Sequence, residues 1–79
     1  MIFLIEYSRS EGRILTFERF EDSQRREAQD ARFKIDLDLN RRGISHEVVI
    51  LEAESEAAIR RTHRRYFETL REILQTDIN

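Results

Sequence analysis

The longest regular hydrophobic pattern of the chain lies in residues 54–75 and has the period of an α-helix. At about 100° per residue, its apolar side chains fall along one side of the helix and charged side chains occupy the opposite side. Ser55 stands at the start, where its hydroxyl can accept a hydrogen bond from a free amide. The pattern predicts an amphipathic helix that must pack on other apolar residues. Its apolar side consists of Ile59, Tyr66, Leu70 and Ile73, with His63, Phe67 and Leu74 beside it.

Three shorter stretches have the pattern of β-strands. Residues 1–7 are apolar at odd and even positions, which is typical of a strand covered on both faces and predicts the central strand. Residues 13–20 alternate and predict a more exposed edge strand, and Gly12 can take the positive φ of a hairpin turn between the two. Residues 46–52 contain the run VVIL and predict a third strand.

Residues 22–42 allow two interpretations, of which the first is a helix. Asp22 or Ser23 would cap its start, and Gly43 would end it in the left-handed conformation, after arginines that suit the negative helix end. One side of this helix would be apolar and would face the sheet. That inner side would consist of Ala28, Ala31, Ile35 and Leu39.

Phe33 and Leu37 distinguish the helix from the second interpretation, a strand. In the helix they would point away from the inner side. In a strand, Phe33, Ile35, Leu37 and Leu39 would alternate with polar residues, and the sequence NRRG would form a hairpin loop into the third strand. Because aspartate is a poor strand residue and leucine a good helix former, we favour the helix and keep the strand as the alternative.

The predicted elements follow the order β-β-α-β-α in one domain over residues 1–79. A right-handed crossover over the first strand places the third strand on its far side, parallel to the second, so the strand order is 2-1-3. We therefore expect an α+β fold: a small two-layer sandwich of a three-stranded mixed sheet with two helices on one face. This arrangement leaves the other sheet face, together with Phe33 and Leu37, without cover from the chain itself, which predicts a partner.

Charge and composition limit the classes of function. The chain has 14 basic and 16 acidic residues and a net charge of −2, so it has no overall attraction to nucleic acid or to an anionic membrane. It has no cysteine, which excludes disulfides and thiolate metal sites. No stretch has the length of a membrane span and the first residues lack a signal-peptide pattern, so we expect a soluble cytoplasmic protein that contacts no membrane.

Few residues could carry catalysis. His46 and His63 have no second ligand at the i+3 or i+4 spacing that would hold a metal ion on one helical face. His63 lies at the margin of the apolar side of its helix, where it could act as a general acid or base beside arginines, but nothing supplies a nucleophile. With Gly12 and Gly43 as its only glycines, the chain cannot form the usual phosphate-binding loop. We therefore predict no catalytic residue, no metal and no cofactor.

The densest group of like charge lies on the last predicted helix and carries a local charge of +4. Such a helix face could follow the phosphates of a nucleic acid. Glutamates one turn away could instead pair with these arginines in solvent, and the group lacks exposed aromatic or amide side chains that would contact bases. We favour the solvated face over the nucleic-acid patch. The group consists of Arg60, Arg61, Arg64 and Arg65.

These patterns predict a small noncatalytic protein that acts as a homo-oligomeric interaction or regulatory module. Its expected partner is a second copy, in a homodimer, or another protein, and the candidate interface is formed by Phe33 and Leu37. The alternative is a small nucleic-acid-binding protein that uses the four arginines. An enzyme with His63 as proton carrier ranks third.

Overall fold

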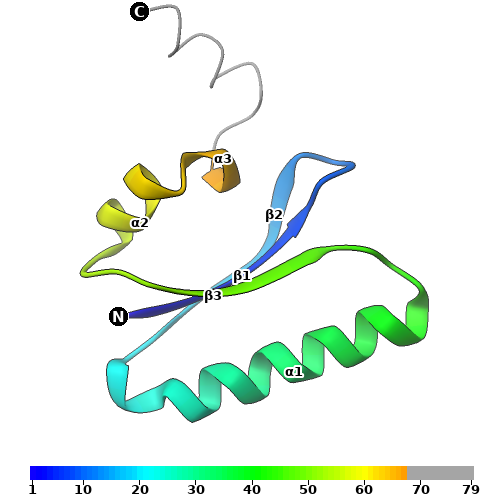
Figure 1. Ribbon diagram of the computed structural model, residues 1–79, viewed down its shortest axis with the longest axis horizontal. Helices are drawn as coiled ribbons and strands as arrows, with labels where there is room; N and C mark the ends of the chain where they lie inside the picture. The colour runs from blue at the N-terminus through cyan, green and yellow to red at the C-terminus, as the bar shows by residue number, and fades with distance from the viewer. Residues whose placement is uncertain (68–79) are drawn as a thin grey trace, which may run out of the picture.

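The computed structural model describes residues 1–67, with Arg65 described by its backbone alone. Within these residues the elements follow the predicted order, with a 3₁₀ helix before the first α-helix and the last helical region in two parts (Figure 1). The elements are β1 (Ile2–Ser8), β2 (Arg13–Phe20), η1 (Asp22–Gln24), α1 (Arg25–Arg42), β3 (Glu47–Glu52), α2 (Glu56–Thr62) and α3 (Arg64–Phe67).

β1 is the central strand of the sheet, and the order β2-β1-β3 confirms the predicted order 2-1-3. Ile5 lies opposite Phe17 of β2 and Val49 of β3, and both pairings are antiparallel. β2 and β3 are parallel to each other, as the crossover requires, but they are not neighbours. The prediction of a mixed sheet is therefore wrong. Both pairs of neighbouring strands in residues 1–67 are antiparallel, because β1 runs against each of the strands beside it.

α1 occupies the residues whose pattern allowed either a helix or a strand, and the helix is confirmed. Ala28 and Leu39 on its inner side are buried. Gly43 ends the helix with φ at 64°, and its N–H donates to the carbonyl of Asn40 at 3.3 Å. A left-handed residue at this position satisfies carbonyls that the helix end leaves free, as the sequence predicts.

The start of α1 differs from the prediction. Neither Asp22 nor Ser23 caps it, because both lie in η1 and Gln24 occupies the cap position. The side-chain oxygen Oε1 of Gln24 accepts a hydrogen bond from the N–H of Glu21 at 2.9 Å. The N–H of Gln24 in turn donates to the carbonyl of Glu21 at 2.9 Å and closes the 3₁₀ turn, so α1 begins only at Arg25.

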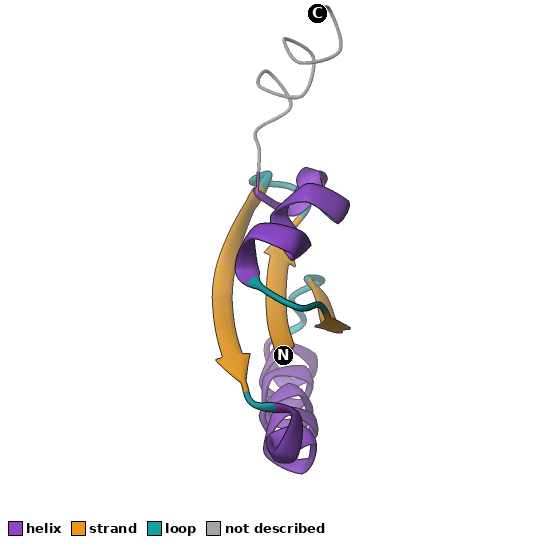
Figure 2. Cartoon of the chain, turned by 90° about the vertical axis from the view of Figure 1, so that its left-hand side faces the viewer, coloured by secondary structure: helices purple, strands orange, loops and turns teal. Residues whose placement is uncertain are grey.

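The two helical regions cover opposite faces of the sheet (Figure 1, Figure 2). On one face, Leu39 of α1 packs in a cluster with Leu4 and Val48. On the other face, Phe17 of β2 meets Phe67 of α3 with ring centroids 5.4 Å apart. Side chains alternate between the faces of a strand. The prediction of a two-layer sandwich with two helices on one face is thus wrong, and the described chain forms three layers.

The burial of β1 explains the third layer. Phe3 and Ile5, which point away from α1, have no exposed surface and so require cover on their own face. The right-handed crossover determines only the face on which α1 lies. The chain after β3 passes to the remaining face, where α2 places the fully buried Ile59.

The helix predicted over residues 54–75 is interrupted at His63. Ser55 caps α2 as predicted, and its Oγ accepts a hydrogen bond from the N–H of Ala58 at 3.1 Å. His63 has φ of −125° and ψ of 50°, outside the helical region, and ends α2. Residues 68–75 of the predicted helix lie outside the described part of the chain.

The interruption brings two consecutive aromatic residues of α3 onto the sheet. Tyr66 meets the ring of Tyr7 edge-on at 5.3 Å between centroids, while Phe67 meets Phe17. The hydroxyl of Tyr66 donates to Oε1 of Glu47 at 2.6 Å. Consecutive residues of a helix point about 100° apart, so a turn that redirects α3 allows both rings to reach one face.

Candidate functional site

The outer face of α1, directed away from the sheet, is the best candidate for a functional surface. Phe33 is 63% exposed and Leu37 is 39% exposed, and they lie one helical turn apart. At about 100° per residue, each points roughly 160° from Ile35 on the inner side. Nothing in the described chain lies beyond this face (Figure 1, Figure 2). We define the outer face of α1 as Arg26, Asp30, Phe33, Leu37, Asn40 and Arg41.

Some charges of α1 are paired within the helix and others have no partner among the described residues. On the flanks, Arg32 lies 3.6 Å from Asp36 and Arg42 lies 3.1 Å from Asp38, each within one helical turn. On the outer face, Asp30 and Arg41 are exposed and have no ion-pair partner among the described residues. Asp30 and Arg41 have opposite sign and stand before and after the apolar pair along the helix. Arg26, on the same face, is likewise exposed and has no ion-pair partner among the described residues.

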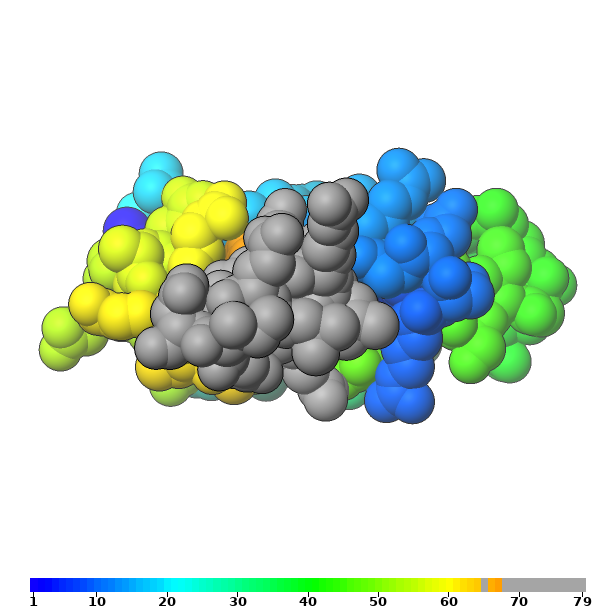
Figure 3. All heavy atoms as spheres, turned by 90° about the horizontal axis from the view of Figure 1, so that it is seen from above, coloured from blue at the N-terminus to red at the C-terminus, as the bar shows by residue number. Residues whose placement is uncertain are grey.

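The predicted arginine patch is divided by the turn at His63. Arg60 and Arg61 lie on α2, which reaches the surface opposite α1 (Figure 3), whereas Arg64 and Arg65 lie on α3. The sequence predicts all four arginines on one continuous helix face, whereas the structure divides them between two helices.

The arginines of α2 have different surroundings. The guanidinium of Arg60 lies 2.8 Å from the carboxylate of Glu56 and 4.7 Å from the ring centre of Phe67. Arg61 is exposed and has no ion-pair partner in residues 1–67. Arg60 is thus engaged within the chain through an i,i+4 pair and a cation–π contact.

A half-buried polar cluster lies under the C-terminal half of α1, on the sheet. Oε2 of Glu6 in β1 is 2.7 Å from Nδ1 of His46, and the hydroxyl of Thr16 in β2 donates to Oε1 of the same carboxylate at 2.9 Å. The side chains of Glu6 and His46 are 13% and 16% exposed. The carboxylate therefore joins all three side chains in one hydrogen-bonded network.

This network could not be predicted from the sequence because 40 residues separate Glu6 from His46. The available signal is Glu6 itself, a charged residue within the apolar run of the central strand, which needs a partner when buried. A carboxylate that orients an imidazole is part of many acid–base sites. Here the hydroxyl of Thr16 bonds to the carboxylate, and no hydroxyl of residues 1–67 bonds to the ring of His46. The arrangement satisfies polar groups and supplies no nucleophile.

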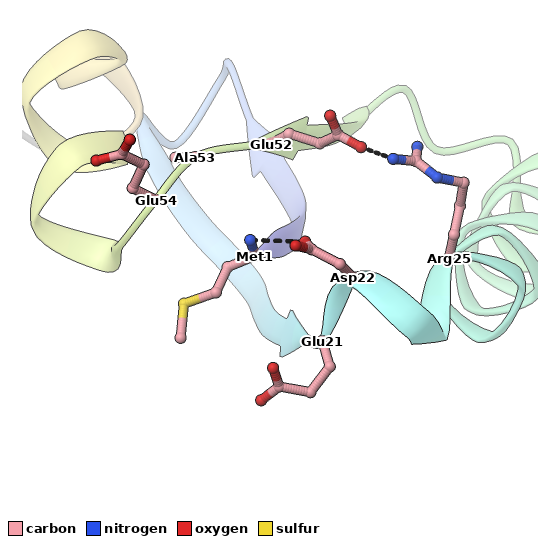
Figure 4. Close-up of a pocket in the computed structure, with 7 residues that line it drawn as sticks. All are labelled: Met1, Glu21, Asp22, Arg25, Glu52, Ala53 and Glu54. Carbon is pink, nitrogen blue, oxygen red and sulfur yellow. Dashed lines mark ion pairs between the residues drawn. The ribbon is translucent and has the colours of Figure 1, made fainter.

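An open hollow at the start of α1 is lined by acidic and basic groups (Figure 4). The amino group of Met1 lies 2.8 Å from Asp22, and Arg25 pairs with Glu52. The hydrogen bond from this amino group, with its charge, lowers the pKa of the Asp22 carboxyl below its usual value. The two cations that line the hollow therefore already have carboxylate partners within the chain.

Neither a metal site nor a membrane-spanning helix is found within the described chain. Residues 1–67 contain no group of three His, Cys, Asp or Glu side chains placed to hold a metal ion, and no helix with the length and apolar composition needed to cross a membrane. Comparison of the chain with protein-family models, curated proteins and solved structures found no match.

Proposed function

We propose that this protein is a noncatalytic interaction module that self-associates through the outer face of α1. The observation that carries the proposal is the exposure of Phe33 and Leu37, which lie side by side on a helix whose other side is buried in the core. Large apolar side chains that form an exposed patch are typical of interaction surfaces. Among residues 1–67, no nucleophile is bonded to His46, which is consistent with a noncatalytic role.

The apolar surface available for association is smaller than the sequence predicts. Because α2 and α3 cover the second face of the sheet, that face does not add to the interface. The large exposed apolar residues among those described are Leu15, Phe33 and Leu37. Stable interfaces bury about 800 Å² on each partner. We therefore expect weak, concentration-dependent association with a dissociation constant in the micromolar range.

The proposal is tested by light scattering or sedimentation of the parent protein and of two leucine variants. Leu37→Ala removes apolar surface from the outer face of α1 and should weaken association. Leu15→Ala is a matched control, because Leu15 on β2 is 38% exposed against 39% for Leu37, and should leave association unchanged. A parent protein that remains monomeric at tens of micromolar, or equal effects of the two substitutions, would contradict the proposal.

Nucleic-acid binding by the four arginines is the alternative function and has less support. Arg60 already contacts Glu56 and Phe67, and the turn at His63 separates the arginines of α2 from those of α3. A phosphate-binding face needs several cations free along one line.

A further inference from the structure

We infer that two copies of this chain pair through antiparallel α1 helices, with Asp30 of each copy beside Arg41 of the other. This inference rests on the proposed function and adds the direction and register of the contact. It starts from Asp30 and Arg41, two of the three exposed charges on the outer face of α1 that have no ion-pair partner among residues 1–67; Arg26 is the third. Within a single chain Asp30 and Arg41 are eleven residues apart and cannot meet on one straight helix, because about 16 Å of helix separates them.

The apolar pair and the charged pair share one centre along the helix. Phe33 and Leu37 are symmetric about position 35, and Asp30 and Arg41 are symmetric about a point half a residue further on. At about 100° per residue, Asp30 and Arg41 also project to the same side of the line between Phe33 and Leu37, roughly 20° from each other. These four residues are therefore arranged almost symmetrically about one point of the helix, with two apolar residues close to it and charges of opposite sign further out on either side.

A two-fold axis across this centre makes the face complementary to itself. In an antiparallel pair, residues equally distant from the centre lie opposite each other, so Phe33 of one copy packs on Leu37 of the other. The same operation places Asp30 beside Arg41 twice, once at each end of the contact. Asp30 and Arg41 thereby each gain a partner of opposite sign.

A parallel pair of α1 helices would bring charges of the same sign together. A two-fold axis along the helices would place Asp30 beside Asp30 and Arg41 beside Arg41 of the second copy. Like charges in contact disfavour an interface and determine which arrangement forms. Charge therefore selects the antiparallel arrangement, while the apolar pair supplies the contact.

Charge reversal tests the register. Asp30→Arg and Arg41→Asp each place like charges opposite each other in a pair of identical chains. Each variant alone should self-associate about tenfold or more weakly than the parent, in sedimentation equilibrium at low salt. An equimolar mixture should regain the parent affinity as a mixed dimer, because both ends then carry opposite charges. The double variant D30R/R41D should regain it as well.

The controls separate this inference from the proposed function. Glu11→Arg changes the net charge as Asp30→Arg does, but in the β1–β2 turn, and should leave association unchanged; circular dichroism of each variant reports the fold. A parent that associates while the single reversals have no effect, or while the mixture is not restored, overturns the register and leaves the proposed function standing. A parent that is monomeric throughout overturns both.

Discussion

The inner and outer sides of α1 carry similar apolar residues and have opposite environments. Leu39 on the inner side is 6% exposed, whereas Phe33 on the outer side is 63% exposed. Phe33, Ile35, Leu37 and Leu39 alternate along the sequence, as they would in a strand. In a helix the same four separate into two pairs on opposite sides. The comparison teaches that the helical period, rather than hydrophobicity, determines which leucine is buried in the core, Leu39, and which remains exposed for association, Leu37.

The largest expected effect on stability comes from Leu39→Ala. Leu39 packs against Leu4 and Val48, so its truncation leaves a cavity and should lower the free energy of unfolding by about 2–5 kcal/mol. Leu37→Ala is the control and should lower it by less than about 1 kcal/mol, because it removes exposed surface. Urea unfolding at low protein concentration measures both. Equal losses for the two variants would refute the division of α1 into two sides.

The second test concerns the hydrogen-bonded network of Glu6, His46 and Thr16 on the sheet face that α1 covers. Glu6→Ala removes the carboxylate that binds His46 and Thr16 and should lower the free energy of unfolding by about 1–3 kcal/mol. Thr16→Val removes one of the two hydrogen bonds and should cost less. Thermal unfolding of both variants near neutral pH gives the difference. If Glu6→Ala proves neutral, the network does not contribute to stability.

The third test concerns the end of α1. Gly43 has φ of 64°, and a Cβ added there would meet no atom within 4 Å, so the cost of a side chain is conformational. Gly43→Ala should lower the free energy of unfolding by about 1–2 kcal/mol. Gly43→Asn should cost less, because asparagine enters the left-handed region more readily. Urea titration compares them, and a neutral alanine variant would contradict the left-handed cap.

The smallest effect is expected away from α1, at the arginines. Replacing Arg61 and Arg65 together with glutamine should change the free energy of unfolding by less than about 1 kcal/mol, since exposed charges contribute little. Fluorescence anisotropy with RNA and with single- and double-stranded DNA should detect no binding before or after the change. Salt-sensitive binding by the parent that the double substitution abolishes would place the nucleic-acid function first.

Local features of this fold could be predicted from the sequence. The strands, their order, the helix over the ambiguous residues and the positive φ of Gly12 and Gly43 all follow from short-range patterns. Each of these depends on neighbours in sequence or on the handedness of one connection.

Features that depend on distant residues could not be predicted. The face that α2 and α3 cover depends on which side of β1 remains open after α1 has packed. The turn at His63 places Tyr66 and Phe67 on rings of β1 and β2, which no helical period reveals. The bond between Glu6 and His46 likewise joins segments 40 residues apart. The exposure of Phe33 and Leu37 was predictable, whereas their use as an interface stays a prediction.

The order of the elements along the chain has a consequence for biosynthesis. The central strand β1 is synthesised before its pairing strand β3 and before the buried Ile59 of α2, which follow α1 in the sequence. Until then the run IFLI can pair only with β2 and leaves apolar surface exposed. Such a segment is prone to aggregation and attracts chaperones that hold unfolded chains. We therefore expect the nascent β1–β2 hairpin to be the most vulnerable folding intermediate.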